Sequence, residues 1–395
     1  MRRPAFALAA MLGATLGMAV GACRAVAGIK DIEYIAADSE PPLSDAEAGP
    51  PSPDAPGCSS TTRLFSTPDP LQSLAVTGGD VIVGVAVGPG SLASQGVLDC
   101  TTAGCSSPST VVRAPDDAGA LSWGSFATSP GFVYYSLTGS PGSGDDGGVL
   151  WGLIDTVLLD GTNPNKYILA EYPYLLVVAG GSLYWVNDPT QAGDTGSSTL
   201  SQCPLAGPDS PGCKPSNVPG VPGNAWIANL GHTYSLFADS TNVYVLADDP
   251  SSASSAATLY ACSLATSCAT SPPRAIFKGV DASSAFSFAG DGTYVYATDA
   301  ATAGQIMRIQ VSSGTAVAMP GVGTQQSPTG LAVDGTYLYW ATSTGDVYAI
   351  DKTGGTPMAV ACNQAQPSLV ATDDTSVYFT VTENGESVVN RVPRP

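Results

Sequence analysis

The alternation of hydrophobic and polar positions is clearest between residues 327 and 361. Short alternating runs are separated there by turn residues: GLAVD ends at Asp334-Gly335-Thr336, YLYWATS at Thr344-Gly345, and DVYAIDK at Thr353-Gly354-Gly355. Asp-Gly, Thr-Gly and Gly-Gly between β-branched and aromatic runs are strong hairpin signals. The stretch therefore predicts four short antiparallel strands. Because one such unit cannot bury both of its faces alone, it must recur and stack against its copies.

The strand–turn–strand core of this unit recurs seven times along the chain. The central residue of the seven copies is Ile82, Tyr134, Tyr184, Tyr244, Tyr296, Tyr339 and Tyr378. The copies lie 39 to 60 residues apart, and four-stranded units at such intervals indicate β-propeller blades. The sequence predicts an all-β fold, a seven-bladed propeller of four-stranded antiparallel blades over residues 58–395. Six blades are the alternative, because the second unit is irregular over residues 149–172.

The two ends of the repeat array complement one another. The last copy has a third strand at residues 386–393 and then no room for a fourth, whereas residues 61–67 (TTRLFST) precede the first copy and belong to no blade. We therefore expect the N-terminal segment to supply the missing outer strand of the last blade. This arrangement closes the ring and removes an open sheet edge that would invite aggregation.

Several of these repeats resemble a known class of blade. The segments LYWAT (338–342), LYWVND (183–188) and VYATD (295–299) resemble the second strand of YWTD and NHL-type propeller blades, and GLAVDGT (330–336) resembles their first strand. The chain as a whole resembles bacterial lipoprotein propellers. The resemblance implies an architecture and no particular activity, since such propellers include receptors, scaffolds and enzymes.

The N-terminal residues predict export. Arg2 and Arg3 precede an apolar run, so residues 1–22 are typical of a signal peptide. Val20-Gly21-Ala22-Cys23 resembles the bacterial lipobox, which implies that Cys23 carries the lipid. Residues 23–57 are rich in Pro, Ala and Asp and are expected to form a tether. We expect a lipoprotein of the cell envelope, at the outer membrane, held to the membrane by its lipid anchor only. Cleavage after Ala27, which would give a soluble secreted protein, remains open.

The charge of the chain narrows the choice of partner. Lys and Arg total 14 against 33 Asp and Glu, for a net charge of −19. Because phosphate binding needs clustered Lys and Arg, nucleic acid is excluded as a partner.

The cysteines predict disulfides at equivalent places in the repeat. Apart from Cys23, they are Cys58, Cys100, Cys105, Cys203, Cys213, Cys262, Cys268 and Cys362. Three close pairs, Cys100 with Cys105, Cys203 with Cys213 and Cys262 with Cys268, each follow the third strand of a blade, and their spacing matches no zinc or redox motif. Cys58 and Cys362 remain as a pair by elimination, although idealised strand directions place them at opposite ends of their strands.

Catalytic chemistry finds little support in the sequence. The chain has one histidine, His232, and no Gly-x-Ser-x-Gly motif, so we assign no catalytic residues. His232 lies in residues 222–235, which suggest an irregular insertion before the fourth blade. Trp226, His232 and Tyr234 are the candidate ligand patch of this insertion, because such side chains stack on sugars and peptides. The alternative is an aromatic loop that packs on the propeller.

Metal binding is the remaining candidate chemistry. Asp239, Asp291, Asp334 and Asp373 recur at the turn after the first strand, where they either form a ring of carboxylates or bond their own backbone. The latter interpretation accounts for the recurrence without a ligand. Asp145 and Asp146 form one acidic loop, too few ligands for a calcium cage. We assign no metal site and no cofactor, with calcium as the alternative.

These observations lead to one functional expectation and one competitor. The expectation is a non-enzymatic cell-envelope propeller that binds a protein or a glycan through one face of the ring. The competitor is a calcium-dependent hydrolase of the lactonase type, whose site would use carboxylates in the channel and needs no histidine.

Overall fold

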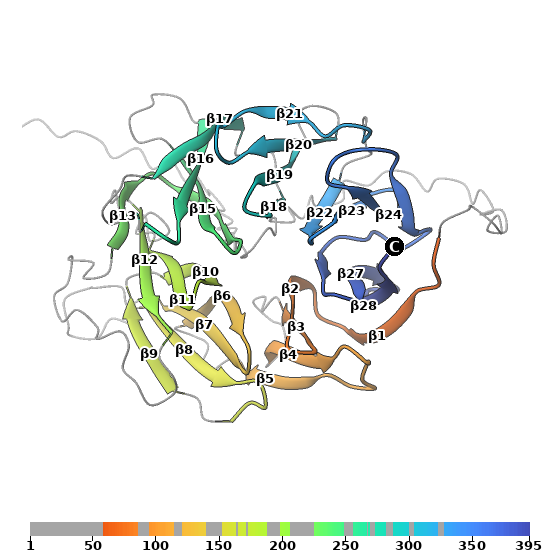
Figure 1. The fold of residues 1–395 in the computed structure, drawn as a ribbon. Coiled ribbons are helices and arrows are strands. Elements are labelled where there is room, and N and C mark those ends of the chain that lie inside the picture. The colour runs from red at the N-terminus through yellow and green to blue at the C-terminus, as the bar shows by residue number, and fades with distance from the viewer. Residues whose placement is uncertain are drawn as a thin grey trace, which may run out of the picture.

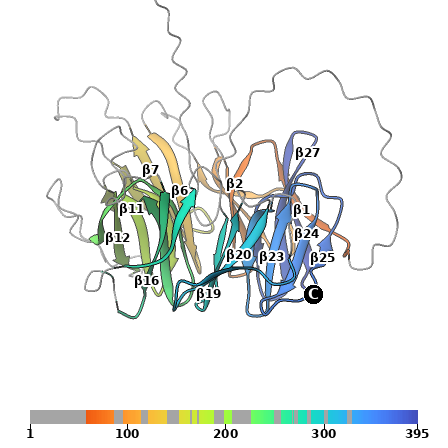
Figure 2. The ribbon, with the colours of Figure 1, turned by 90° about the horizontal axis from the view of Figure 1, so that it is seen from above.

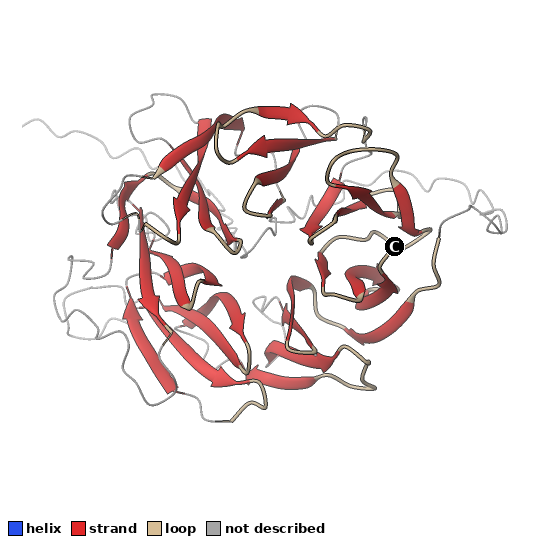
Figure 3. Cartoon of the chain, viewed as in Figure 1, coloured by secondary structure: helices blue, strands red, loops and turns tan. Residues whose placement is uncertain are grey.

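The structure is a computed structural model. It describes residues 58–85, 95–113, 121–139, 152–162, 165–170, 173–187, 198–205, 225–248, 256–266, 268, 273–281, 287–299, 304–322 and 328–395. In these ranges every regular element is a strand (Figure 3). No helix in them is long and apolar enough to cross a bilayer. The predicted leader (1–22), Cys23 and the predicted tether (23–57) lie outside the described residues.

The strands form seven four-stranded antiparallel sheets, which we call blades I to VII. Blade I contains β2 (Leu71–Thr77), β3 (Asp80–Val85), β4 (Gln95–Thr101) and β5 (Ser109–Arg113). Blade II contains β6 (Leu121–Ser129), β7 (Phe132–Gly139), β8 (Gly152–Leu158) and β9 (Asn165–Ala170). Blade III contains β10 (Pro173–Ala179), β11 (Ser182–Asn187), β12 (Ser198–Pro204) and β13 (Ala225–Leu230). Blade IV contains β14 (Thr233–Ala238), β15 (Asn242–Asp248), β16 (Ala256–Ser263) and β17 (Arg274–Asp281).

The remaining three blades follow the same order. Blade V contains β18 (Phe288–Gly290), β19 (Tyr294–Asp299), β20 (Gln305–Gln310) and β21 (Ala316–Ala318). Blade VI contains β22 (Pro328–Val333), β23 (Tyr337–Thr342), β24 (Val347–Asp351) and β25 (Met358–Ala361). Blade VII contains β26 (Val370–Thr372), β27 (Ser376–Glu383), β28 (Glu386–Pro393) and, as its outer strand, β1 (Thr62–Thr67).

The blades are arranged as a ring around a central axis (Figure 1). The first strand of each blade is the innermost, and each of these strands contacts the first strand of the next blade all the way round. Viewed from the edge, the ring is a flat disc (Figure 2). The predicted seven-bladed propeller is therefore confirmed. The irregular second unit is a full sheet, β6-β7-β8-β9, which removes the six-bladed alternative.

The ring is closed by the N-terminal strand, as predicted. β1 pairs antiparallel with β28, from Thr62 opposite Arg391 to Thr67 opposite Ser387. Leu64 and Phe65 of β1 are each only 4% exposed and belong to the cluster that joins blade VII to blade I. The closing strand is therefore held by backbone pairing and by buried apolar side chains together.

The core of the described residues consists of apolar clusters between neighbouring blades. Each of the seven interfaces has one such cluster. The central residue of each repeat lies in the cluster that its blade shares with the following blade, as Tyr339 does between blades VI and VII. The recurrence of this residue in the sequence thus marks one contact that is repeated around the ring.

The alternating strand directions give the ring two different faces. The turns between first and second strands lie on one face, which we call the turn face; they are two or three residues long in every blade. The connections between second and third strands lie on the opposite face, which we call the connection face. They grow from two residues in blade VII (384–385) to twelve in blade II (140–151). The connections between third and fourth strands return to the turn face and also vary in length, from five residues in blade V (311–315) to twenty in blade III (205–224).

Disulfides join neighbouring segments of the ring. Cys100 is bonded to Cys105 and Cys262 to Cys268, and each disulfide joins the end of a third strand to the connection that follows it. Cys203 is also disulfide-bonded, and its expected partner Cys213 lies outside the described residues.

The fourth disulfide connects Cys58 to Cys362, with 5.8 Å between their Cα atoms. Idealised strand directions place these two residues at opposite ends of their strands. In the structure Cys58 lies in the segment before β1, and this segment reaches Cys362. The N–H of Ser59 donates to the carbonyl of Val360 at 3.1 Å, so residues 58–61 run beside β25 of blade VI before β1 begins. The N-terminal segment therefore contacts two blades, VI and VII.

Candidate functional site

The recurring aspartates of the turn face form the most ordered polar arrangement of the described residues. In blades IV to VII the turn reads Asp-x-Thr-x-x-Tyr, with Asp239, Asp291, Asp334 and Asp373 at the first position. In each copy Oδ1 of the aspartate accepts the backbone N–H groups two and three residues later, at 2.6 to 3.0 Å. The turn interpretation of these residues is confirmed, because each carboxylate stabilises its own hairpin.

The second carboxylate oxygen binds the tyrosine five residues later. The Tyr339 hydroxyl donates to Oδ2 of Asp334 at 2.6 Å, and the same bond recurs in the other three blades at 2.6 to 3.4 Å. Burial and the neighbouring carboxylate raise the pKa of these tyrosines above the usual value, to about 12 for Tyr378. The hydroxyls therefore remain protonated and act as donors.

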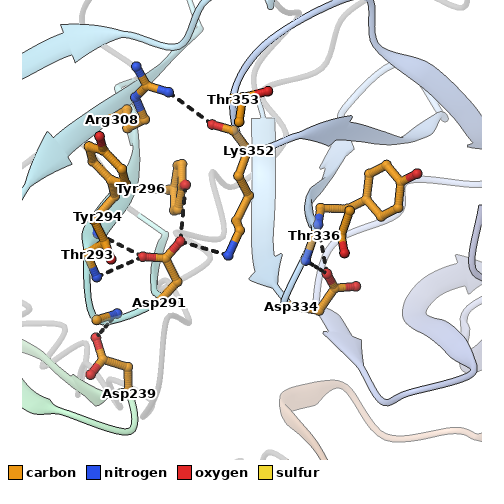
Figure 4. A network of polar contacts seen from close by, with 12 residues as sticks. Asp239, Asp291, Thr293, Tyr294, Tyr296, Arg308, Asp334, Thr336, Lys352 and Thr353 are labelled. Atoms are coloured by element: carbon orange, nitrogen blue, oxygen red, sulfur yellow. Dashed lines mark hydrogen bonds and ion pairs between the residues drawn. The ribbon is translucent and has the colours of Figure 1, made fainter.

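Groups from the following blade complete three of these four sites. The N–H of Gly292 donates to Oδ2 of Asp239 at 2.7 Å. The Lys352 ammonium lies 3.0 Å from Oδ2 of Asp291, and the Arg394 guanidinium lies 2.6 Å from Oδ2 of Asp334 (Figure 4 shows the Lys352 pair). Each contact crosses a blade interface at the turn face. The aspartates therefore join blades IV, V, VI and VII in sequence.

Two arginines of the third strands also form contacts across blade interfaces. Arg308 donates to the carbonyl of Lys352 at 2.9 Å and lies over the ring of Tyr294, 4.8 Å from its centre (Figure 4). Arg391 donates to the carbonyl of Thr102 in blade I. Both arginines lie opposite the central tyrosine of their blade, since Tyr296 pairs with Arg308 and Tyr378 with Arg391.

Blades I to III form the turn differently. Their two-residue turns are Gly78-Gly79, Pro130-Gly131 and Gly180-Gly181, and the glycines have positive φ. Thr77, Ser129 and Ala179 occupy the place that aspartate has in the other blades. The turn face is therefore divided into four blades that are linked by carboxylates and three that are not.

The electrostatics of these sites favour ionised aspartates. Burial raises the pKa of Asp291, Asp334 and Asp373, but hydrogen-bond donors outweigh it in all three, together with Lys352 at Asp291 and Arg394 at Asp334. The pKa of each carboxyl is therefore lower than its usual value. The carboxylates are charged at neutral pH, and donors within the fold bind both oxygens of each.

This direction of the pKa shifts predicts acid lability. A carboxyl whose pKa is lower in the folded than in the unfolded state contributes stability above its unfolded pKa, near 4, and that contribution is lost as the pH falls through the folded pKa. We expect the thermal midpoint to be steady from pH 7 to about pH 5 and to fall below about pH 4. Calorimetry across this range, with Asp291→Asn as the comparison, measures the effect; an equally steep fall in the variant would contradict the assignment to Asp291.

Within the described ranges no group of three or more His, Cys, Asp or Glu side chains could hold a metal ion. Each of the recurring aspartates binds donors of its own hairpin, and Asp239, Asp291 and Asp334 also bind a group of the adjoining blade. Asp145 and Asp146, the other acidic pair, lie outside the described residues.

The structure corrects the expectation for residues 222–235. The described part is not an irregular insertion: β13 (225–230) is the outer strand of blade III and β14 (233–238) is the inner strand of blade IV. The mostly apolar run AWIANL supplies a strand, and only Gly231 and His232 connect it to the next blade. The aromatic and turn residues of this stretch concealed the strand from sequence analysis.

Two of the three expected patch residues lie together on the connection face. The rings of His232 and Tyr234 meet edge to face, 4.8 Å apart, and the Tyr234 hydroxyl donates to both carboxylate oxygens of Asp248 at 3.0 and 3.1 Å. The N–H of Asp248 donates to the carbonyl of His232 at 2.9 Å. Trp226 lies at the beginning of β13, whereas His232 follows its end.

Sequence analysis did not anticipate the Asp–Tyr bonds or the cross-blade cations. The signal was present, because Asp-x-Thr-x-x-Tyr occurs four times, and Lys352 and Arg394 both follow the third strand of their blades. A spacing of five across a three-residue turn brings the two side chains to one side of the hairpin. The contact with the next blade depends on the ring itself and cannot be derived from one repeat.

Comparison with known proteins supports the fold and no family. No protein-family model matches the sequence, and no curated protein matches it. Among solved structures, the Pan2 WD40 domain of Neurospora crassa is 7% identical, with a TM-score of 0.50, over 86% of this chain and 98% of that chain. BamB from Moraxella catarrhalis is 12% identical, with a TM-score of 0.42, over 85% and 99% of the two chains. A gluconolactonase from Xanthomonas campestris is 14% identical, with a TM-score of 0.40, over 84% and 97%. The match to the WD40 domain is a likeness of fold alone, and a propeller fold is compatible with binding and with enzymatic roles.

Proposed function

We propose that the protein is a non-enzymatic lipoprotein of the cell envelope that binds a protein or a glycan through its connection face. The observation that carries the proposal is that the second-to-third-strand connections, of up to twelve residues, and the connections between successive blades both emerge on this face. Connections that extend from a rigid scaffold are the usual carriers of binding function. The His232–Tyr234 pair, on the same face, adds aromatic rings suited to stacking on sugars or peptides.

The sequence of the connections narrows the partner. The seven connections between second and third strands contain six aspartates and no Lys, Arg or His. Asp, Ser, Thr and Asn accept hydrogen bonds from sugar hydroxyls and attract basic side chains, whereas an anionic ligand would be repelled. The proposed partner is therefore a neutral glycan or a basic protein surface.

The proposed location rests on the N-terminal sequence. A diacylated Cys23 followed by residues 24–57 as a tether would hold the ring stably at the membrane, since two lipid chains anchor where one does not. Mass spectrometry of the mature N-terminus distinguishes a lipidated Cys23 from a free Gly28, which would make the protein soluble and secreted.

Site-specific photo-crosslinking in intact cells tests the binding face. A photoreactive residue is placed at Ala365 or Ser343, which are exposed on the connection face, or at Ser240 or Gly335 in turns of the opposite face. We expect adducts from the first two positions and none from the second two. Adducts from Ser240 or Gly335 alone would overturn the choice of face.

A calcium titration tests the competing enzyme function. In the lactonase-type alternative, carboxylates in the channel bind calcium and the ligand stabilises the fold, so the thermal midpoint rises by many degrees at micromolar calcium. We expect no shift, because the turn-face carboxylates are engaged by donors within the fold. A large rise in the thermal midpoint would contradict the proposed binding function and support the enzymatic alternative.

A further inference from the structure

The Cys58–Cys362 disulfide differs from the two other fully described disulfides in its accessibility. Cys58 is exposed and Cys362 is half-buried. In contrast, Cys100 and Cys262 are 2% and 1% exposed, and their partners Cys105 and Cys268 are half-buried against apolar clusters, so neither hairpin disulfide has an exposed cysteine. Because exchange requires a thiolate to reach a sulfur atom, the Cys58–Cys362 bond is the one that a reductant in solution can attack most readily.

The same disulfide holds the end of the strand that closes the ring. β1 continues at its C-terminal end into β2 of blade I, after only three residues. Its N-terminal end, four residues after Cys58, is fixed to blade VI through Cys362 and through the Ser59–Val360 hydrogen bond. With both ends fixed, β1 cannot separate from β28 by fraying from a free end.

Reduction would leave the N-terminal end of β1 held by non-covalent contacts alone, while its other end stays joined to β2. These contacts include the pairing with β28, the Ser59–Val360 hydrogen bond, the buried Leu64 and Phe65, and the exposed ion pairs of Arg63 with Glu383 and Glu386. The ladder is already irregular between Arg63 and Phe65, near the end that reduction frees. Loss of β1 would expose the edge of β28, whose Val388, Val389 and Val392 are otherwise fully buried.

We propose that Cys58–Cys362 is a redox-sensitive latch on ring closure, selectively opened by a dithiol reductant. A thiolate of the reductant attacks Sγ of Cys58, which breaks the Sγ–Sγ bond and releases Cys362 as a thiolate that takes up a proton. The second thiol of the reductant then displaces Cys58, forming a cyclic disulfide. Two electrons pass from the dithiol to the protein, and β1 gains a free end.

Stepwise reduction of the full chain tests the order of opening. The protein is incubated with increasing dithiothreitol, its free thiols are alkylated, and peptide mapping identifies them. We expect Cys58 and Cys362 to be modified at a dithiothreitol concentration about tenfold lower than the hairpin cysteines require. Reduction of Cys100–Cys105 or Cys262–Cys268 first, or at the same concentration, would overturn the proposal.

Hydrogen exchange tests the consequence for the ring. After selective reduction, the exchange rates of amides in β1 and β28 should rise about tenfold more than those of β22 and β23 in blade VI. The double variant Cys58→Ser/Cys362→Ser should show the same pattern without reductant, and the matched control Cys100→Ser/Cys105→Ser should keep β1 protected. Unchanged exchange in β1 after reduction would overturn the proposed latch. This measurement on the reduced natural chain remains decisive even if the double variant does not fold.

Discussion

Replacing Cys58 and Cys362 together by serine is expected to cause the largest loss of stability of any disulfide replacement among the described pairs. The two cysteines are separated by 304 residues in the sequence, whereas Cys100 and Cys105 are separated by 5. The entropy that a cross-link removes from the unfolded chain grows with the length of the closed loop. This relation gives about 5–6 kcal/mol for Cys58–Cys362 and about 2 kcal/mol for Cys100–Cys105.

Urea denaturation of the two double-serine variants measures this difference. The variant Cys100→Ser/Cys105→Ser is the matched control, because it also removes one disulfide but closes a short hairpin. The slope of the unfolding free energy against urea should rise in the Cys58→Ser/Cys362→Ser variant, since its unfolded chain is less compact. Equal losses in both variants would show that the long loop does not determine the stabilisation.

The closing of the ring could be predicted from the sequence because it is a matter of counting strands. The last repeat lacks a fourth strand and residues 61–67 lack a blade, so one solution satisfies both, and β1 pairs with β28 accordingly. The path of residues 58–61 beside β25 could not be predicted, because it depends on how two adjacent blades lie in space. Idealised strand directions within one blade place Cys58 and Cys362 apart for this reason.

The side-chain contacts of the turn face could also be predicted only where they are local in the sequence. Asp334 could be recognised as a turn residue from its immediate neighbours, since its bonds to the N–H groups of Thr336 and Tyr337 are local. Its contact with Arg394 joins residues that are 60 positions apart in the sequence. The repeat indicates that both residues face the same interface only after the number of blades and the ring closure are known.

The sequence analysis missed the strand at residues 225–230 for a different reason. AWIANL is mostly apolar and does not alternate. It lies between a Pro/Gly-rich stretch and the aromatic residues of the next blade, and its repeat interval is the longest of the chain. Local composition therefore favoured a loop. The requirement that blade III needs an outer strand before β14 begins would have identified it, because every other blade has four strands.

Replacing Asp334 by alanine is expected to cost about 3 kcal/mol of stability. The carboxylate side chain is 10% exposed and binds the Thr336 and Tyr337 N–H groups, the Tyr339 hydroxyl and Arg394. Its removal leaves the buried hydroxyl and the guanidinium without their anionic partner, and the loss of one partner of a buried pair costs about 3–5 kcal/mol. The lower end of this energy range applies because the Arg394 side chain is 21% exposed and can be hydrated.

The matched control for Asp334→Ala is Asp351→Ala in the same blade. Asp351 also accepts bonds from the residue two positions later, at 2.8 Å from the Thr353 N–H and 2.7 Å from its hydroxyl, but it is exposed and contacts no other blade through its carboxylate. We expect this variant to unfold nearly as the unmodified protein does. A double-mutant cycle of Asp334→Ala with Arg394→Ala isolates the interaction between these two side chains across the blade interface. We expect a coupling free energy of about 1–3 kcal/mol. If the two substitutions were simply additive, Asp334 would stabilise only its own hairpin, and the aspartates of the turn face would not join the blades.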